Sequence, residues 1–209
     1  MPEESTAAPA APGTVRPGGR TSRVRSVVLD ATLHELAERG YAGLSIERIA
    51  ERSGVNKTTI YRRWQNKEAV LVAAIDDMTE DLYPLQATGS IEEYLRSYAR
   101  RLVDLLTDDS PTVAGALRAL FSDAAREPQI GELKRNFFAR RDRDAASMVD
   151  AAIKLGELPT DVDVREFLDL AAAPIYYRKL VTDGPLDYAV ADRAVATALI
   201  AVRAGACHR

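Results

Sequence analysis

The chain has 209 residues, of which 46% are hydrophobic and 28% are charged. This length is enough for one sizeable core or for a small domain joined to a larger one, and the composition is that of a globular protein. A single cysteine excludes a disulfide within the chain, and no apolar run reaches the roughly 18 residues of a transmembrane helix. The N-terminus also lacks an apolar signal segment. We therefore expect a cytoplasmic protein with no membrane partner.

Charge is distributed unevenly along the chain. Residues 16–67 hold 11 Lys and Arg against 5 Asp and Glu, a net charge of +6, whereas the remaining residues carry −9. A basic N-terminal segment followed by an acidic body favours contact between one end of the protein and a polyanion. Chance clustering of solvated charge explains the same asymmetry, so charge alone does not decide between the two.

Helical periodicity dominates from residue 22 onward, and neither strand-like alternation nor internal repeats occur. Residues 1–21 are rich in Pro, Ala and Gly and are predicted to form a disordered basic arm. The chain is therefore predicted to be all-α. The predicted helices span residues 23–39, 46–53, 57–64, 67–85, 91–106, 112–126, 129–155, 162–181 and 187–204.

Three short helices are predicted to start within residues 44–71, which read LSIERIAERSGVNKTTIYRRWQNKEAVL. Ser45 and Asn56 are suited to cap the first and second of them, because their side-chain oxygens can accept a hydrogen bond from a free backbone N–H. Gly54 ends the first helix, since glycine adopts the left-handed conformation without penalty. The two helices are then separated by about three residues, which is the length of the turn in a helix-turn-helix motif.

The second of these helices, residues 57–64, presents two different faces. Ile60 and Trp64 are four residues apart and are expected to face the core. Donor groups remain on the outside: Lys57, Thr58, Thr59, Tyr61, Arg62 and Arg63. Such groups suit the major groove of DNA, where Lys and Arg reach guanine or phosphate and Thr contacts thymine. A solvated basic surface helix is the alternative, and the coincidence of cap, glycine turn and aromatic anchor disfavours it.

Lys67 follows a third cap residue, Asn66, and lies in the first turn of the next predicted helix. A helix N-terminus together with a lysine is an anion site, so we expect a phosphate contact there. Surface lysines are also common at such positions.

Together these residues resemble the DNA-binding domain of the tetracycline-repressor (TetR) family. The motifs that carry the resemblance are Gly40-Tyr41, Ser45-Ile46, Ile49-Ala50, Ser53-Gly54-Val55, Ile60-Tyr61, Trp64 and Asn66-Lys67-Glu68. The resemblance covers about residues 25–71. It implies an N-terminal three-helix DNA-binding domain with a helix-turn-helix, residues 22–68, followed by a larger helical ligand-binding and dimerisation domain, residues 69–209.

The resemblance also implies roles for individual residues. Phosphate contacts are implied for Ser45, Tyr61 and Lys67, and base contacts for Lys57, Thr58, Thr59 and Arg62. In the basic arm, we expect Arg16 and Arg20 to reach phosphates or the minor groove. The partner implied is a double-stranded DNA operator.

A homodimer is expected, because one recognition helix covers too few base pairs to find a site in a genome. Dimers place two such helices about 34–36 Å apart on a palindrome. The last two predicted helices carry apolar and small residues that suit a four-helix bundle on a two-fold axis. The residues expected at this interface are Leu168, Ala172, Ile175, Ala194, Val195, Ala198, Leu199 and Val202. Ordinary core within one chain is the alternative interpretation of the same residues.

Aromatic residues recur on the long middle helices. In the family that the chain resembles, such residues line a cavity for a small hydrophobic effector. The residues expected to do so are Tyr94, Tyr98, Phe121, Phe137, Phe138 and Tyr177. Plain core packing is the alternative for each of them. We expect a repressor that an effector releases from its operator, and a ligand-independent regulator of the same fold is the alternative.

Catalysis is not expected. The sequence contains no Walker loop, no GxSxG, no HExxH and no GxGxxG, and its two histidines are isolated. Asp161-Val162-Asp163 begins like a calcium loop, but Arg165 and Glu166 stand where that loop needs an oxygen ligand and a glycine. We therefore expect no catalytic residue, no metal and no cofactor.

Overall fold

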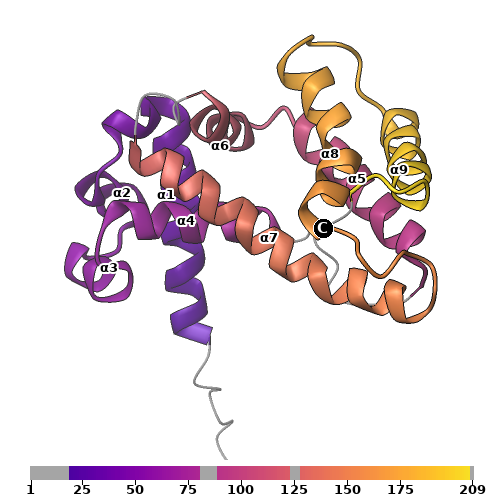
Figure 1. Cartoon of the computed structure of the whole chain (residues 1–209). Helices are drawn as coiled ribbons and strands as arrows, with labels where there is room; N and C mark the ends of the chain where they lie inside the picture. The colour runs from indigo at the N-terminus through magenta and orange to yellow at the C-terminus, as the bar shows by residue number, and fades with distance from the viewer. Residues whose placement is uncertain (1–18, 81–88, 123–127, 208–209) are drawn as a thin grey trace, which may run out of the picture.

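A computed structural model describes residues 19–80, 89–122 and 128–207. Helices account for the regular structure in these ranges, with no strand, which confirms the predicted all-α class (Figure 1). The helices are α1 (Gly19–Gly43), α2 (Ile46–Ser53), α3 (Lys57–Trp64), α4 (Lys67–Met78), α5 (Ile91–Thr107), α6 (Pro111–Phe121), α7 (Pro128–Lys154), α8 (Val164–Leu180) and α9 (Tyr188–Arg203). Within the same ranges, none of the helices combines the length and apolarity that a membrane span requires.

Several helix ends differ from the predicted ones. Helix α1 begins at Gly19, so residues 19–21, which we assigned to the arm, are helical, and residues 1–18 lie outside the described ranges. Helix α4 ends at Met78 instead of extending to residue 85, and Thr79 is its C-cap. Helix α8 contains Pro174 and is continuous from Val164 to Leu180.

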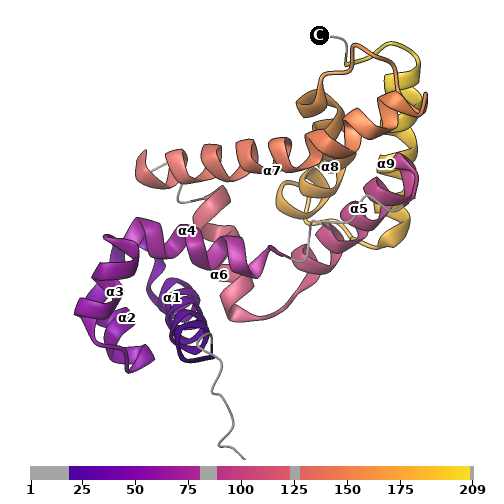
Figure 2. The same ribbon diagram turned by 90° about the horizontal axis from the view of Figure 1, so that it is seen from below.

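Buried side chains form two apolar cores. The first core joins α1, α2, α3 and α4 to α6 and to the N-terminal half of α7, around side chains such as Ile49, Ile60 and Leu71. The second joins α5, α8 and α9 to the C-terminal half of α7, around side chains such as Leu102 and Phe167. Figure 2 shows α7 running from one group of helices to the other. Helix α7 therefore contributes side chains to both cores and is one continuous helix between them.

Candidate nucleic-acid interface and cavity

The helix-turn-helix segment forms through the capping residues that the sequence indicates. Ser45 Oγ accepts a hydrogen bond from the Arg48 N–H at 3.3 Å and begins α2. Gly54 ends α2 with φ 67 and ψ 11, the left-handed conformation that favours glycine. Asn56 Oδ1 accepts from the Thr58 N–H at 2.8 Å and begins α3. The turn between the two helices is thus fixed by local hydrogen bonds and by one glycine.

Helix α3 is anchored on one side and open on the other. Its inner residues are buried, with Ile60 0% and Trp64 8% exposed. An eight-residue helix is not stable alone, so these two side chains hold it against the rest of the first core. Five of the six donors expected on the outside are exposed, namely Lys57, Thr58, Tyr61, Arg62 and Arg63, and Thr59 is half-buried. The outer face is therefore basic and rich in hydrogen-bond donors.

The cations of α3 differ in their partners. The Arg63 guanidinium lies 5.1 Å from the centroid of the Trp64 ring and donates to the backbone oxygen of Thr21 at 3.5 Å. Lys57 and Arg62 have no ion pair, hydrogen bond or ring contact with any residue that the structure describes. Lys57 and Arg62 are thus available to an external anion, whereas Arg63 is held against its own chain.

Lys67 has a structural role that the sequence analysis missed. Its ammonium lies 4.2 Å from the centroid of the Tyr41 ring and donates to the Tyr41 backbone oxygen at 3.5 Å. The Tyr41 hydroxyl in turn donates to Glu68 Oε1 at 2.6 Å. These contacts hold the end of α1 against the start of α4, next to α3. Helix α4 begins at its cap residue Asn66, whose Oδ1 accepts a hydrogen bond from the Ala69 N–H at 2.8 Å.

A buried carboxylate fixes α2 against α1. Glu35 is 4% exposed and accepts from Arg52 Nε at 2.7 Å and from Arg39 Nε at 3.1 Å. Burial by itself raises the pKa of the Glu35 carboxyl, and the two guanidiniums more than offset this, so that its pKa lies below the ordinary value. Glu35 therefore stays ionised and holds the end of α2 in place.

The arm is largely outside the described residues. Arg16 lies in that part of the chain, and so does the side chain of Arg20, whose backbone belongs to α1. Among the described residues there is also no group of His, Cys, Asp or Glu that could hold a metal ion.

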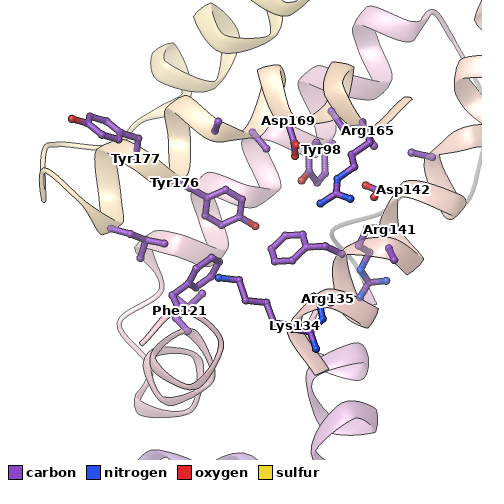
Figure 3. A pocket seen from close by; sticks show the side chains of 18 of the residues that line it. Tyr98, Phe121, Lys134, Arg135, Arg141, Asp142, Arg165, Asp169, Tyr176 and Tyr177 are labelled. Carbon is purple, nitrogen blue, oxygen red and sulfur yellow. The ribbon is translucent and has the colours of Figure 1, made fainter. Parts of the chain in front are cut away.

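A cavity of about 1230 Å³ lies between α5, α6, α7 and α8 (Figure 3). Five of the six aromatic residues expected at an effector site line it, namely Tyr94, Tyr98, Phe121, Phe138 and Tyr177. The sixth does not: Phe137 is buried in the first core, where its ring lies 4.7 Å from the Arg141 guanidinium. The prediction for Phe137 is therefore corrected: successive side chains of a helix differ in direction by about 100°, so that Phe137 points into the first core while its neighbour Phe138 reaches the cavity, with the two rings in edge-to-face contact at 5.3 Å.

The lining also contains residues that the sequence analysis missed. Helix α7 contributes Lys134 and Arg141, which together with Phe138 are spaced at i, i+4 and i+7, and helix α8 contributes Tyr176. The helical spacing to Phe138 is the signal that could have identified Lys134. Burial raises the pKa of the Tyr94 phenol, and Asp144 acts in the same direction, so this hydroxyl stays protonated in the cavity.

The dimer-interface prediction requires a correction. Seven of the eight residues are buried within one subunit, in the second core: Ala172, Ile175, Ala194, Val195, Ala198, Leu199 and Val202. The eighth, Leu168, packs against the same core, and both Leu168 and Ala172 line the cavity. The prediction thus selected the inward faces of α8 and α9, which pack on α5 and on each other.

The outward faces of the same two helices carry exposed apolar side chains. These are Leu170 on α8 and Ile200 on α9, of which Ile200 is 68% exposed. The exposed Tyr177, Leu180 and Val181 line the cavity, and Tyr188 contacts Arg100 and Asp104 of α5.

Comparisons with known proteins agree with this architecture. Residues 28–74 match the family described as bacterial regulatory proteins, tetR family, and residues 85–198 match the tetracyclin repressor-like C-terminal domain. The uncharacterized HTH-type transcriptional regulator YdeS of Bacillus subtilis is 31% identical over 163 residues, which cover 78% of this chain and 81% of YdeS. The DNA-binding transcriptional repressor TetR of Mycobacteroides abscessus is 28% identical over 200 residues, covering 87% of this chain and 95% of the repressor.

A solved structure supports the same relationship. The TetR family transcription regulator SCO0332 superposes with a TM-score of 0.68 and 31% identity, over 86% of this chain and 98% of SCO0332. These relatives are regulators of transcription and not enzymes, which confirms that expectation from the sequence. The chain belongs to the tetR family of bacterial regulatory proteins, and it is a DNA-binding transcriptional regulator with a helix-turn-helix.

Proposed function

We propose that the protein is a sequence-specific repressor, which binds a palindromic operator as a homodimer in the cytoplasm and is released by a small-molecule effector. The observation that carries this proposal is helix α3, which is held by Ile60 and Trp64 and carries on its outer face Lys57 and Arg62, neither of them paired with a described residue. The relative from Mycobacteroides abscessus is named a repressor, which favours repression as the output.

Contacts to DNA are assigned from the exposed face. Lys57, Thr58 and Arg62 are exposed and reach base edges in the major groove, and the half-buried Thr59 contributes at its margin. Phosphates are contacted by Ser45, Tyr61 and Lys67, and by Arg63, whose guanidinium keeps further N–H donors beyond the one on the Thr21 oxygen. We assign the Arg20 side chain to the minor groove or to a phosphate.

The dimer forms through the outward faces of α8 and α9. Leu170 and Ile200 are 37% and 68% exposed in the single subunit, and a second copy would cover them. A two-fold contact of two helices from each subunit gives a four-helix bundle, which sets the separation of the two recognition helices.

The cavity is the effector site in this proposal. Its volume of about 1230 Å³ is large for a packed helical body and disfavours the alternative of a ligand-independent regulator. Helices α6 and α7 line the cavity and also pack in the first core beside α1 and α4. An effector that binds one arrangement of these helices better than the other shifts the position of the recognition helix and lowers operator affinity.

A selection from random double-stranded DNA tests the proposal. Full-length protein is expected to enrich a palindrome whose half-sites are about 10 base pairs apart, one turn of the helix. A double variant, Lys57→Ala with Arg62→Ala, is expected to lose the enrichment, and Lys154→Ala, an exposed lysine at the end of α7, is the matched control. Binding of all sequences alike at moderate salt, or enrichment by the double variant, would contradict the proposal.

A further inference from the structure

Three rings from three helices form one aromatic cluster in the cavity: Phe121 of α6, Phe138 of α7 and Tyr176 of α8. The Phe121 centroid lies 5.2 Å from that of Tyr176 and 6.3 Å from that of Phe138, and the ring planes are inclined at 44° and 64°. Phe138 and Tyr176 are 6.3 Å apart at 79°. Inclined rings offer both faces and edges, which is the surface that a flat aromatic ligand packs on.

One ammonium group lies beside this cluster. Lys134 Nζ is 4.6 Å from the centroid of the Phe121 ring, and Figure 3 shows the side chain extending from α7 towards Phe121. No carboxylate of the described residues is within ion-pair distance of Lys134. By contrast, Arg141 also lines the cavity from α7 but forms ion pairs with Asp76 and Asp144. A half-buried ammonium without a counter-ion gains most from an anion that the cavity admits.

The charges of the lining favour an anion over a cation. Apart from Arg141, which pairs with Asp76 and Asp144, four cationic side chains line the cavity, Arg118, Lys134, Arg135 and Arg165, against two carboxylates, Asp142 and Asp169. Burial raises the pKa of the Asp142 carboxyl, although the nearby Arg165 opposes this. A cationic ligand would also compete with Lys134 for the face of Phe121, because that ring already holds a positive charge.

We infer that the cavity binds an aromatic carboxylic acid, with its rings against Phe121, Phe138 and Tyr176 and its carboxylate on the Lys134 ammonium. This inference rests on the proposed function of the cavity as the effector site and names the chemical class of the effector. The volume of about 1230 Å³ accommodates several fused rings, since drug-sized ligands occupy sites of about 300–1,000 Å³.

Three fluorescent probes with one apolar body and different head groups test the inference on the full-length protein. Pyrenebutanoate carries a carboxylate, pyrenebutanol a neutral hydroxyl and pyrenebutylamine an ammonium. We expect the acid to bind about tenfold more tightly than the alcohol and the amine to bind most weakly, because only the acid brings a negative charge to the Lys134 ammonium. Hexadecanoate, a carboxylate without rings, is expected to bind more weakly than pyrenebutanoate. Equal binding of acid and alcohol, or tighter binding of the amine or of hexadecanoate, would overturn the inference.

Two lysine variants locate the carboxylate. Lys134→Met keeps the apolar stem and removes the charge, so affinity for the acid should fall about tenfold, to that of the alcohol, and affinity for the alcohol should stay unchanged. Lys154→Met, on the same helix but outside the cavity, is the control and should alter neither. Equal losses for acid and alcohol in Lys134→Met would overturn the assignment. Operator affinity is measured separately: an acid that binds through Lys134 without releasing DNA supports the ligand class and contradicts only the release mechanism.

Discussion

Gly115 of α6 lies directly against Ala37 of α1: a Cβ atom added to Gly115 would be 2.6 Å from Ala37 Cα and 3.0 Å from Ala37 Cβ. Side-chain atoms do not approach a backbone that closely, so the two helices cross at this distance only because residue 115 has no side chain. The contact joins a helix that lines the cavity to the first helix of the DNA-binding unit. A shift of α6 would therefore be transmitted to α1.

Gly115→Ala is expected to lower the free energy of unfolding by about 1–3 kcal/mol, because the added methyl group overpacks the crossing. In a helix with free space at that position the same substitution stabilises the protein by about 0.5–1 kcal/mol. The sign of the change in the free energy of unfolding therefore tells whether α6 and α1 are in close contact at residue 115. Urea denaturation followed by circular dichroism gives the measurement. A variant more stable than the wild type would show that α6 and α1 are not in close contact at this position.

Arg141 connects the cavity to the end of α4. Its Nη2 donates to Thr79 Oγ1 at 2.6 Å and to Asp76 Oδ1 at 3.4 Å, and the residue is 7% exposed. Arg141→Gln leaves buried partners unsatisfied and should cost about 1–3 kcal/mol of stability. It should also reduce the change in operator affinity that a cavity ligand causes, which fluorescence anisotropy of labelled DNA measures.

Arg140→Gln is the matched control for this prediction. Arg140 pairs with the same carboxylate, Asp76, but its side chain is 53% exposed, and pairs of that kind contribute little to stability. We expect the control to keep both its stability and its ligand response. An Arg141→Gln protein with the full ligand response would rule out this connection between α7 and α4.

Glu35 makes the stability of the DNA-binding unit dependent on pH. Its carboxyl pKa is lower in the folded protein than in the unfolded chain, because Arg52 and Arg39 outweigh the effect of burial. This contribution is therefore present above the unfolded pKa and is lost as the pH falls through the lower, folded pKa. Glu35→Gln should be about 1–2 kcal/mol less stable than the wild type at pH 7. The difference should narrow on acidification, as thermal melts across the acid range would reveal, and a difference independent of pH would contradict this account.

The sequence predicts the local features of the DNA-binding unit well. Ser45, Asn56 and Asn66 cap their helices as expected, because capping depends on residues within one turn of the chain. Ile60 and Trp64 are buried as expected, since a period of four residues defines the inner face of so short a helix. The alignment of these local signals explains why one quarter of the chain is enough to identify the family.

The body is predicted less well, because periodicity identifies a buried face but not what covers it. Ala194 and Val195 belong to the apolar face of α9 and are buried by α5 and α8 of the same chain. Ile200 is exposed and lies outside that apolar face, so periodicity does not predict that a partner covers it. Phe137 and Phe138 are adjacent in sequence, yet one packs in the first core and the other lines the cavity. The two rings touch, with centroids 5.3 Å apart, and only the three-dimensional arrangement of the helices around α7 decides which of them borders the cavity.

The outward face of α9 provides a test of the dimer. Ile200→Glu places a charge on a side chain that is 68% exposed in the single subunit and that a second copy would cover. We expect a monomer by light scattering coupled to gel filtration, because a buried unpaired charge costs more than the contact contributes. Leu155→Glu, 72% exposed at the end of α7, is the control and should leave the dimer intact. A dimeric Ile200→Glu protein would place the subunit contact elsewhere.

Lys57 and Lys67 separate base contacts from phosphate contacts. Lys57→Ala should cost about 1–3 kcal/mol on the selected operator and much less on scrambled DNA, because only the operator offers the matching base edge. Lys67→Met should weaken binding to both DNAs equally and reduce the slope of affinity against salt concentration by about one unit, as the loss of one phosphate contact does. Because the Lys67 ammonium also rests on the Tyr41 ring, Lys67→Arg, which keeps the charge, is the control for a structural effect. Equal losses on operator and scrambled DNA for Lys57→Ala would show that this residue contacts the phosphate backbone and does not read the sequence.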